Sequence, residues 1–589
     1  MFRNYLRIIN DERIDTHMNA SGRAVLERII NREDKIKARR CLQAAIAEFK
    51  LGGDGNRHLE CDDILSWKGS EFADNDPFGM YWGVPSAVHL YAKYKSLLSA
   101  TNKNAIENIL LGFYYVCGWS AVNGDGRCER MYLSENHDSL IKSSMLIITE
   151  QLYDKLIEPL KGRDRDTVKK LLYTNVDSTF DSILKDGWLI EGGEPYNAVT
   201  IEGIYNIMEL SEDEKLRNKA KKIVDLFWLI HVQENINGVR GYARARVYPD
   251  WRDNRSAWVS SLFGIYTGLY GATDAGEIDY LVSCDYELPK AVSDILENKE
   301  KKMPYTVETM HRGAGYYVLE RHREDEEGLP TTPIYYLDNY SKILKTTYMT
   351  KDYTVSGFAY PLRMPKTLVA SQFVWEGITY KEPKGLSVCA AIYETGGAYF
   401  DSFVAMHHKN RIIYAQNPNA TAHLPGDNGV EIIGTDNPRY NYNMEICISG
   451  AVCEMQKEYI NKNLLLFTSG GCMFSAQTDE GFTEADSKVL VNSKRLILTA
   501  GSLNDETKEE FVGRIKAQKN IFTQDCIVSC DGEDTMEFNY KNDSSYIRVI
   551  NNKPVDLRSD DYIKSPFINS KMGSGVFYIG TEGKQEVIQ

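Results

Sequence analysis

Apolar residues recur at helical spacing through the first half of the chain. Over residues 23–50 they return every three or four positions, until Gly52 and Gly53 end the pattern. Most connections between such segments are short and contain Gly, Asn or Asp. Helices that follow one another in this way favour a helical bundle or an α/α toroid over a sheet fold. The same spacing predicts further helices over approximately 85–100, 103–118, 137–159, 165–184, 197–210, 213–233 and 256–271.

The pattern changes near Pro304, where short β-branched and aromatic runs begin to alternate with turns. Residues 345–350, 411–415 and 495–500 are runs of this kind. Such alternation is typical of an antiparallel β-sandwich. The predicted fold class is therefore multidomain α+β, an N-terminal (α/α) toroid followed by antiparallel β-sandwich. We expect the toroid over residues 1–300, a β-sandwich domain over 301–490, and a C-terminal β region over 491–589 that could form a second, smaller sandwich.

Length and charge narrow the range of partners. A chain of 589 residues is longer than one ordinary core supports, so several domains are expected. The formal net charge of −14 disfavours nucleic acid as the main partner, although an acidic sugar responds to the local charge of its cleft. No apolar run approaches the ~20 residues of a membrane span, so no membrane partner is expected.

Cysteine usage and the N-terminal residues indicate a compartment. The 11 cysteines have no regular spacing, and their odd number disfavours a complete disulfide framework. The residues after Met1 lack the apolar core of a signal peptide. We therefore expect reduced thiols and a cytoplasmic protein. Neither a nucleotide-cofactor motif nor a clear metal-ligand trio is visible, so no cofactor and no metal are expected.

One basic stretch stands out against the acidic average. Aromatic residues interleave with its arginines, and aromatic faces stack on sugar rings while arginines pair with carboxylates. The stretch is either a solvated basic loop or the wall of a glycan-binding cleft, and the aromatic residues favour the cleft. Its arginines are Arg240, Arg244, Arg246, Arg252 and Arg255, and its aromatic residues are Tyr242, Tyr248, Trp251 and Trp258.

Two polar turns precede predicted helices. The first contains Asn136 and His137, which come just before or inside a helix start. It could be an ordinary N-terminal cap, since Ser134 or Asn136 can accept backbone N–H bonds there. The alternative is a functional pair, because the amide and the imidazole both lie at the exposed end of a helix.

The second turn is richer in chemistry. Gly192 and Gly193 suit a close backbone approach, and Pro195 suits the first turn of the next helix. Tyr196 then lies near the helix entrance, between Glu191 upstream and Tyr205 downstream. Together the two turns offer an amide, an imidazole and a phenol, a combination suited to proton abstraction beside a carboxylate.

These motifs resemble the polysaccharide lyases of the heparinase II/III and oligoalginate lyase type. The resemblance lies in the Asn-His pair at 136–137, the Asp-Gly…Glu-Gly…Tyr turn from Asp186 to Tyr196, and the order of helical and β halves. Chondroitin AC and hyaluronate lyases are similar in architecture. The resemblance implies β-elimination on a uronic-acid glycan, with an acidic polysaccharide or oligosaccharide as the partner.

The resemblance also implies roles for particular residues. Asn136 would neutralise the substrate carboxylate, His137 would be the base or its helper, and Tyr196 would protonate the leaving oxygen. The family contributes a β-domain histidine to the cleft, and three candidates stay open at this point. These are His311, His407 and His408, which join Glu191, Tyr205, Arg240, Arg244, Arg246, Trp251 and Arg255 as expected substrate-binding residues.

Two other functions fit the same residues. An (α/α)-barrel glycoside hydrolase would need two carboxylic acids across the scissile bond. A non-catalytic carbohydrate-binding protein would keep the aromatic wall and tolerate the loss of His137 and Tyr196. The carboxylates available to the hydrolase are Glu135, Asp138, Glu191, Glu194 and Asp253.

Overall fold

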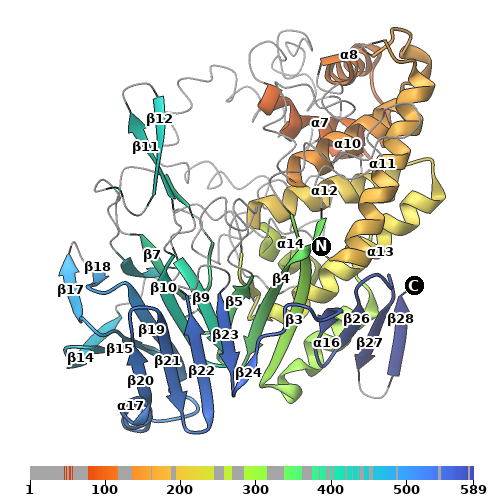
Figure 1. The fold of residues 1–589 in the computed structure, drawn as a ribbon. Helices are drawn as coiled ribbons and strands as arrows, with labels where there is room; N and C mark the ends of the chain where they lie inside the picture. The colour runs from red at the N-terminus through yellow and green to blue at the C-terminus, as the bar shows by residue number, and fades with distance from the viewer. Residues whose placement is uncertain are drawn as a thin grey trace.

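The computed structural model describes most of the chain beyond residue 76. The described residues are 77–116, 135–187, 194–244, 258–269, 284–314, 337–360, 374–417, 421–449, 455–540 and 546–588, with short breaks inside several ranges, and a few between 45 and 56. Figure 1 shows most of the described helices gathered above the sheets.

The helical part comes first in the chain. Its α-helices are α7 (Pro77–Tyr94), α8 (Ala100–Val116), α10 (Glu135–Gln151), α11 (Arg165–Asp186), α12 (Glu194–Leu210), α13 (Glu214–Glu234), α14 (Trp258–Thr267) and α16 (Lys290–Asn298), with short 3-10 helices η2 (Tyr153–Lys155) and η5 (Lys299–Lys302). Aspartates at the expected positions begin two of them: Asp164 accepts from Thr167 N (2.8 Å) and Asp213 from Leu216 N (2.9 Å). The helix predicted over 137–159 is shorter, since α10 ends at Gln151. None of the described helices is both long and apolar enough to cross a membrane.

The largest sheet has twelve strands. They are β3 (Tyr305–Ala314), β4 (Leu337–Met349), β5 (Tyr353–Ala359), β6 (Gly377–Tyr380), β7 (Ser387–Ile392), β13 (Met444–Ser449), β17 (Phe482–Ala485), β18 (Lys488–Val491), β25 (Asp561–Lys564), β26 (Ile568–Lys571), β27 (Phe577–Thr581) and β28 (Lys584–Ile588). Their order in the sheet is β17-β18-β13-β7-β6-β5-β4-β3-β25-β26-β27-β28. The pairing between these neighbours is antiparallel, as the alternating sequence pattern predicts.

A six-stranded sheet packs against the twelve-stranded one. It comprises β9 (Phe403–His408), β10 (Arg411–Gln416), β14 (Gln456–Asn461), β15 (Leu464–Ser469), β16 (Cys472–Gln477) and β19 (Arg495–Ser502), in the order β14-β15-β16-β19-β10-β9. Val355 and Val388 of the larger sheet share one buried cluster with Ile412, Phe474 and Leu498 of the smaller one. The two sheets therefore form an antiparallel sandwich.

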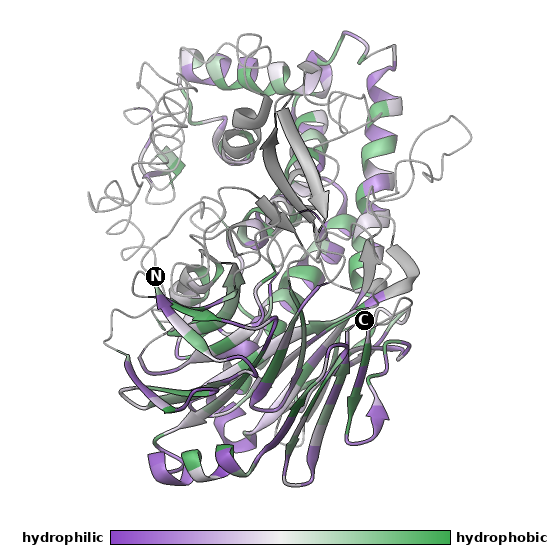
Figure 2. Cartoon of the chain, turned by 60° about the vertical axis from the view of Figure 1, so that its left-hand side comes forward, coloured by the Kyte–Doolittle hydropathy of each residue, from purple (hydrophilic) through white to green (hydrophobic). Residues whose placement is uncertain are grey.

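Smaller elements complete the β part. A five-stranded sheet contains β20 (Lys519–Phe522), β21 (Cys526–Asp531), β22 (Asp534–Asn539), β23 (Ile547–Ile550) and β24 (Lys553–Pro554). A three-stranded sheet contains β8 (Ala398–Phe400), β11 (Thr421–Gly426) and β12 (Gly429–Gly434), and a two-stranded one contains β1 (Asn235–Ile236) and β2 (Val239–Arg240). Helix α17 (Lys508–Ala517) alternates hydrophobic and hydrophilic residues in Figure 2, and its buried Phe511 and Ile515 pack on β15 and β16.

The predicted fold class, helices followed by antiparallel β-sandwich, is confirmed. The division of the β part at residue 490 stays a proposal, and strands from both sides of that residue share sheets. Strand β19 lies inside the six-stranded sheet, while β25 pairs with β3 of the twelve-stranded one. The helices share their core with this sheet, since Tyr305 donates to Gln233 O (2.7 Å) and Tyr562 to Ile183 O (2.9 Å). The six described cysteines form no disulfide with one another.

Candidate active site at the starts of helices α10 and α12

Helices α10 and α12 run side by side in the same direction. Near their starts, Ser139 Oγ donates to the backbone oxygen of Thr200 (2.7 Å). Near their ends, Ser211 Oγ donates to Glu150 Oε1 (3.0 Å). Gly203 permits this approach, because a Cβ there would lie 2.6 Å from the backbone oxygen of Ser139. Parallel packing places the two helix starts, and hence the two predicted catalytic turns, at one end of the pair.

Asn136 and Tyr196 occupy the first turns of these helices. Asn136 is the second residue of α10 and is fully buried, while Tyr196 is the third residue of α12 and is 8 % exposed. First-turn N–H groups carry partial positive charge, which favours a bound anion. The backbone of His137 belongs to α10, but its side chain lies outside the described residues, as do Glu191 and the side chain of Glu194.

The start of α12 also contacts the segment that leads into the β part. Asn197 Nδ2 donates to the hydroxyl oxygen of Tyr242 (2.9 Å). The guanidinium of Arg240 lies over the Tyr242 ring, 3.7 Å from its centroid. The candidate site therefore lies beside the junction between the helices and the sheets.

A buried ion cluster organises this junction. Glu234, the last residue of α13, is fully buried and accepts from both Nε (2.9 Å) and Nη2 (2.8 Å) of Arg240. On β4, Lys345 Nζ lies 2.9 Å from Glu234 Oε1, and Thr347 Oγ1 donates to the same oxygen (3.1 Å). Burial by itself would raise the pKa of Glu234, but Lys345 and Arg240 outweigh it and hold that pKa below its usual value.

Two of the predicted cleft arginines, Arg240 and Arg244, are buried. Arg240 is committed to Glu234 and Tyr242, and Arg244 is 1 % exposed with its guanidinium 4.9 Å from the centroid of Trp375. Arg244 also exchanges two backbone hydrogen bonds with Trp375, at 3.0 and 2.8 Å. Both arginines belong to the buried junction, and their contact with a glycan stays a prediction. The remaining predicted members of this wall, Arg246, Trp251 and Arg255, lie outside the described residues.

Tyr205, which the sequence predicts to contact substrate, is packed in the core of the helical part. It is fully buried, accepts from Trp228 Nε1 (2.8 Å) and lies 3.1 Å from the hydroxyl of Tyr266. Burial raises the pKa of its phenol well above the usual value.

The three candidate histidines lie on opposite faces of the twelve-stranded sheet. Along β3, Glu308 and Met310 line a pocket on one face, whereas Val307 packs with the helices on the other. Since side chains alternate along a strand, buried His311 lies on the helix-facing side. His407 and His408 line the pocket on the other face. They are therefore separated from Asn136 and Tyr196 by the sheet.

Glu234 was not predicted, although the sequence contains a signal for it. A carboxylate in the last turn of an apolar helix opposes the helix dipole, so it requires nearby cations. Arg240 follows six residues later and supplies one of them. Its other partner, Lys345, is distant in sequence, which is why the cluster could not be assembled from local pattern.

No family model and no curated protein matches the sequence. In structure the chain is similar to a chondroitin AC lyase of Streptomyces coelicolor A3, solved in complex with chondroitin sulphate. The alignment covers 93% of this chain and 83% of that chain, with a TM-score of 0.39 and 7% sequence identity.

Proposed function

We propose that this protein is a polysaccharide lyase that cleaves a uronic-acid glycan by β-elimination at the starts of α10 and α12. The proposal rests on the parallel packing of these two helices, which approach each other closely at Gly203. This packing brings Asn136 and Tyr196 to the same end of the pair.

The reaction needs the groups that this end provides. The C5 proton of a uronate lies next to a carboxylate, and its removal becomes feasible when hydrogen bonds let that carboxylate accept the developing charge. The Asn136 amide supplies donors that are neutral at every pH. His137 takes the C5 proton as the base, and the Tyr196 phenol protonates the leaving oxygen as the C4–O4 bond breaks; return of the proton from His137 to Tyr196 through solvent restores both groups. Each well-placed acid or base contributes roughly 10²–10⁴-fold in rate, so these groups suffice without a cofactor.

Burial of the site has a consequence for substrate entry. Because Asn136 is fully buried and Tyr196 nearly so, binding of a glycan must uncover both side chains. Once the substrate is enclosed, hydrogen bonds to its carboxylate act in a low dielectric and are stronger than in water. Among the three candidate histidines we assign His311 to this site, since it is on the helix-facing side of its sheet.

The product of the reaction provides the primary test. Elimination leaves an unsaturated uronate that absorbs in the ultraviolet, so the purified protein should raise absorbance with at least one member of a uronan panel. Hydrolysis would give new reducing ends without absorbance and would replace this proposal with the carboxylate-pair hydrolase.

The variant Tyr196→Phe tests the assigned residue. It removes one hydroxyl, so turnover should fall by roughly 10²-fold or more while the melting temperature changes little. A matched control is Tyr578→Phe on β27, which makes the same change at a residue 46% exposed and should keep full turnover. Near-normal turnover in Tyr196→Phe would remove Tyr196 from the mechanism.

A further inference from the structure

A pocket with both polar and apolar lining lies on the face of the twelve-stranded sheet that is turned away from the helices. It has a volume of about 750 Å³ and is formed by β3, β4, the end of β9, strands β23 and β24, and the segment that follows them. Lys345 and Thr347 of β4 bond to Glu234 on the helix side, whereas Thr346 and Tyr348 line the pocket. A volume of this order accommodates a monosaccharide or disaccharide.

His407 presents an unused acceptor to this pocket. The side chain is 9% exposed, and the backbone of Thr346 accepts a hydrogen bond from its ring. Nε2 has no hydrogen-bond partner among the described residues, so the donor to Thr346 is Nδ1. Burial, with Arg548 and His408 nearby, lowers the pKa of His407 to about 3. The ring is therefore neutral, and Nε2 is a buried acceptor that suits a hydroxyl group of a ligand.

Arg548 presents an unused donor. The residue is 4% exposed, with Nε bonded to Ala405 O (3.0 Å) and Nη1 to Tyr360 O (3.0 Å). Its Nη2 has no hydrogen-bond partner in the part of the chain that the structure describes, and no carboxylate there forms an ion pair with it. The rings of Tyr360, Phe538 and Tyr546 lie 5.6, 5.1 and 5.4 Å from its guanidinium and stabilise the charge in part. A ligand anion at Nη2 would add the counter-charge that the described carboxylates do not supply.

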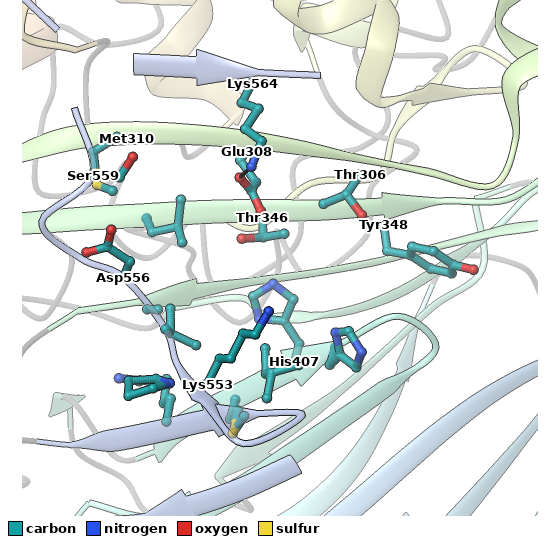
Figure 3. Close-up of a pocket in the computed structure, with 18 of the residues that line it drawn as sticks. Thr306, Glu308, Met310, Thr346, Tyr348, His407, Lys553, Asp556, Ser559 and Lys564 are labelled. Atoms are coloured by element: carbon teal, nitrogen blue, oxygen red, sulfur yellow. Dashed lines mark ion pairs between the residues drawn. The ribbon is translucent and has the colours of Figure 1, made fainter. Parts of the chain in front are cut away.

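Lys553 adds a second cation to the lining, on the same face of the β23–β24 pair as Arg548, since Lys553 pairs with Ile550 and Ile550 is two residues from Arg548. Figure 3 shows its side chain extending into the pocket beside His407. Two other lysines that line the pocket already form ion pairs with carboxylates. Lys564 Nζ lies 3.5 Å from Glu308, and Lys409 pairs with Asp534. Among the described carboxylates, none forms an ion pair with Lys553.

Hydrogen-bonding groups of other kinds also line the pocket. Thr306, Thr346 and Ser559 contribute hydroxyls, and Asp556 contributes a carboxylate on another side of the pocket (Figure 3). Asp556 accepts from the backbone of Arg558 (2.8 Å) and retains capacity for a ligand hydroxyl. The pocket thus combines one anion-binding end with several groups that suit hydroxyls.

We propose that this pocket binds a sugar acid, with its carboxylate between Arg548 and Lys553 and a ring hydroxyl on Nε2 of His407. The ligand class follows from the donor set, since a simple carboxylate would leave His407 unsatisfied and a neutral sugar would leave the two cations unsatisfied. The pocket is separate from the helix ends, so the inference does not depend on the proposed elimination reaction.

Calorimetric titration with glucuronate, glucose and acetate tests this inference. Glucuronate should bind at millimolar concentration or below, and glucose and acetate should each bind at least about tenfold more weakly. Lys553→Gln should weaken glucuronate binding about tenfold, whereas Lys508→Gln on α17 should leave it unchanged. His407→Phe keeps a ring of similar shape and should weaken glucuronate binding while leaving acetate binding unchanged.

Two outcomes would overturn the assignment. One is the absence of glucuronate binding to the wild-type protein, and the other is equal glucuronate affinity in wild type and Lys553→Gln. Titration of Tyr196→Phe separates this pocket from the proposed active site, because that variant should bind glucuronate at this pocket with unchanged affinity. Loss of binding in Tyr196→Phe but not in Lys553→Gln would place the ligand at the helix ends instead.

Discussion

Gly357 brings two buried ionisable side chains close together. A Cβ at this position would lie 2.5 Å from Nδ1 of His407 and 3.0 Å from Oε1 of Glu376, so only glycine leaves room for both. Burial raises the pKa of Glu376 from 4.5 to about 7 and lowers that of His407 from 6.5 to about 3. Both groups therefore favour their neutral forms, and their effects on stability have opposite dependence on pH.

The two effects should be separable by substitution. Glu376 binds its proton more tightly in the folded state, so its contribution to stability is lost as pH rises from 4.5 to about 7. His407 binds its proton less tightly when folded, so its contribution is lost as pH falls from 6.5 towards 3. In the wild type the slopes oppose each other between pH 4.5 and 6.5. In His407→Gln, urea unfolding should show stability falling with pH by about 1.4 kcal/mol per unit in that window, and in Glu376→Gln it should rise. Identical slopes in all three proteins would contradict this.

At the scale of single residues, the sequence predicts which residue types occur together, but it does not predict how deeply they are buried or which distant residues they contact. Arginines interleaved with aromatic residues are typical of a glycan cleft, yet the same pairs stabilise a buried junction, as Arg240 on Tyr242 and Arg244 on Trp375 show. The two uses differ only in burial and in distant partners such as Lys345, which a local pattern does not contain. Asn136 and Tyr196 are each predicted to lie at the start of a helix. A helix start depends on neighbouring residues in the sequence, so local pattern can identify it.

At the scale of elements, Gly203 controls the contact on which the proposed site depends. A Cβ at this position would lie 2.5 Å from Ser139 Oγ and 2.6 Å from its backbone oxygen. The side-chain oxygen could rotate away, but the backbone oxygen could move only if α10 and α12 separated. Overpacking of this kind costs typically about 1–3 kcal/mol.

Gly203→Ala should therefore reduce both stability and turnover. We expect a loss of about 1–3 kcal/mol in the free energy of unfolding, together with lower turnover on any glycan that the wild type cleaves. The matched control is Gly513→Ala in α17, where a Cβ meets nothing within 4 Å. That control should be neutral or more stable by up to about 1 kcal/mol, because alanine is the better helix former. Equal stability of the two alanine variants in urea unfolding would show that the helix contact does not need glycine.

At the scale of the whole molecule, the sequence predicted the order of parts but not their connections. Helical spacing before Pro304 and alternation after it are local, and both are confirmed. The pairing of β25 with β3 joins Ile563 to Thr309. Such a pairing depends on which edges remain free after the rest has folded, so no stretch of local sequence specifies it. Local sequence likewise does not specify the partner of Tyr562, whose hydroxyl donates to the backbone oxygen of Ile183 and so links the C-terminal strands to α11.

The ion cluster around Glu234 links the helical part to the β part, as the apolar core that they share also does. We expect this cluster to decide whether the two parts unfold together. Glu234→Gln leaves Arg240 and Lys345 buried without their carboxylate, which typically costs about 3–5 kcal/mol. Because Arg240 follows α13 and Lys345 lies on β4, we also expect thermal unfolding to divide into two transitions.

Adding Lys345→Met removes one of the charges that Glu234→Gln leaves unpaired and should recover part of the lost stability, which a double-mutant cycle would measure as a coupling energy. The control Glu300→Gln removes an exposed carboxylate paired with Lys381 and should change stability by less than about 1 kcal/mol. A single unchanged transition in Glu234→Gln would show that apolar packing alone holds the halves together.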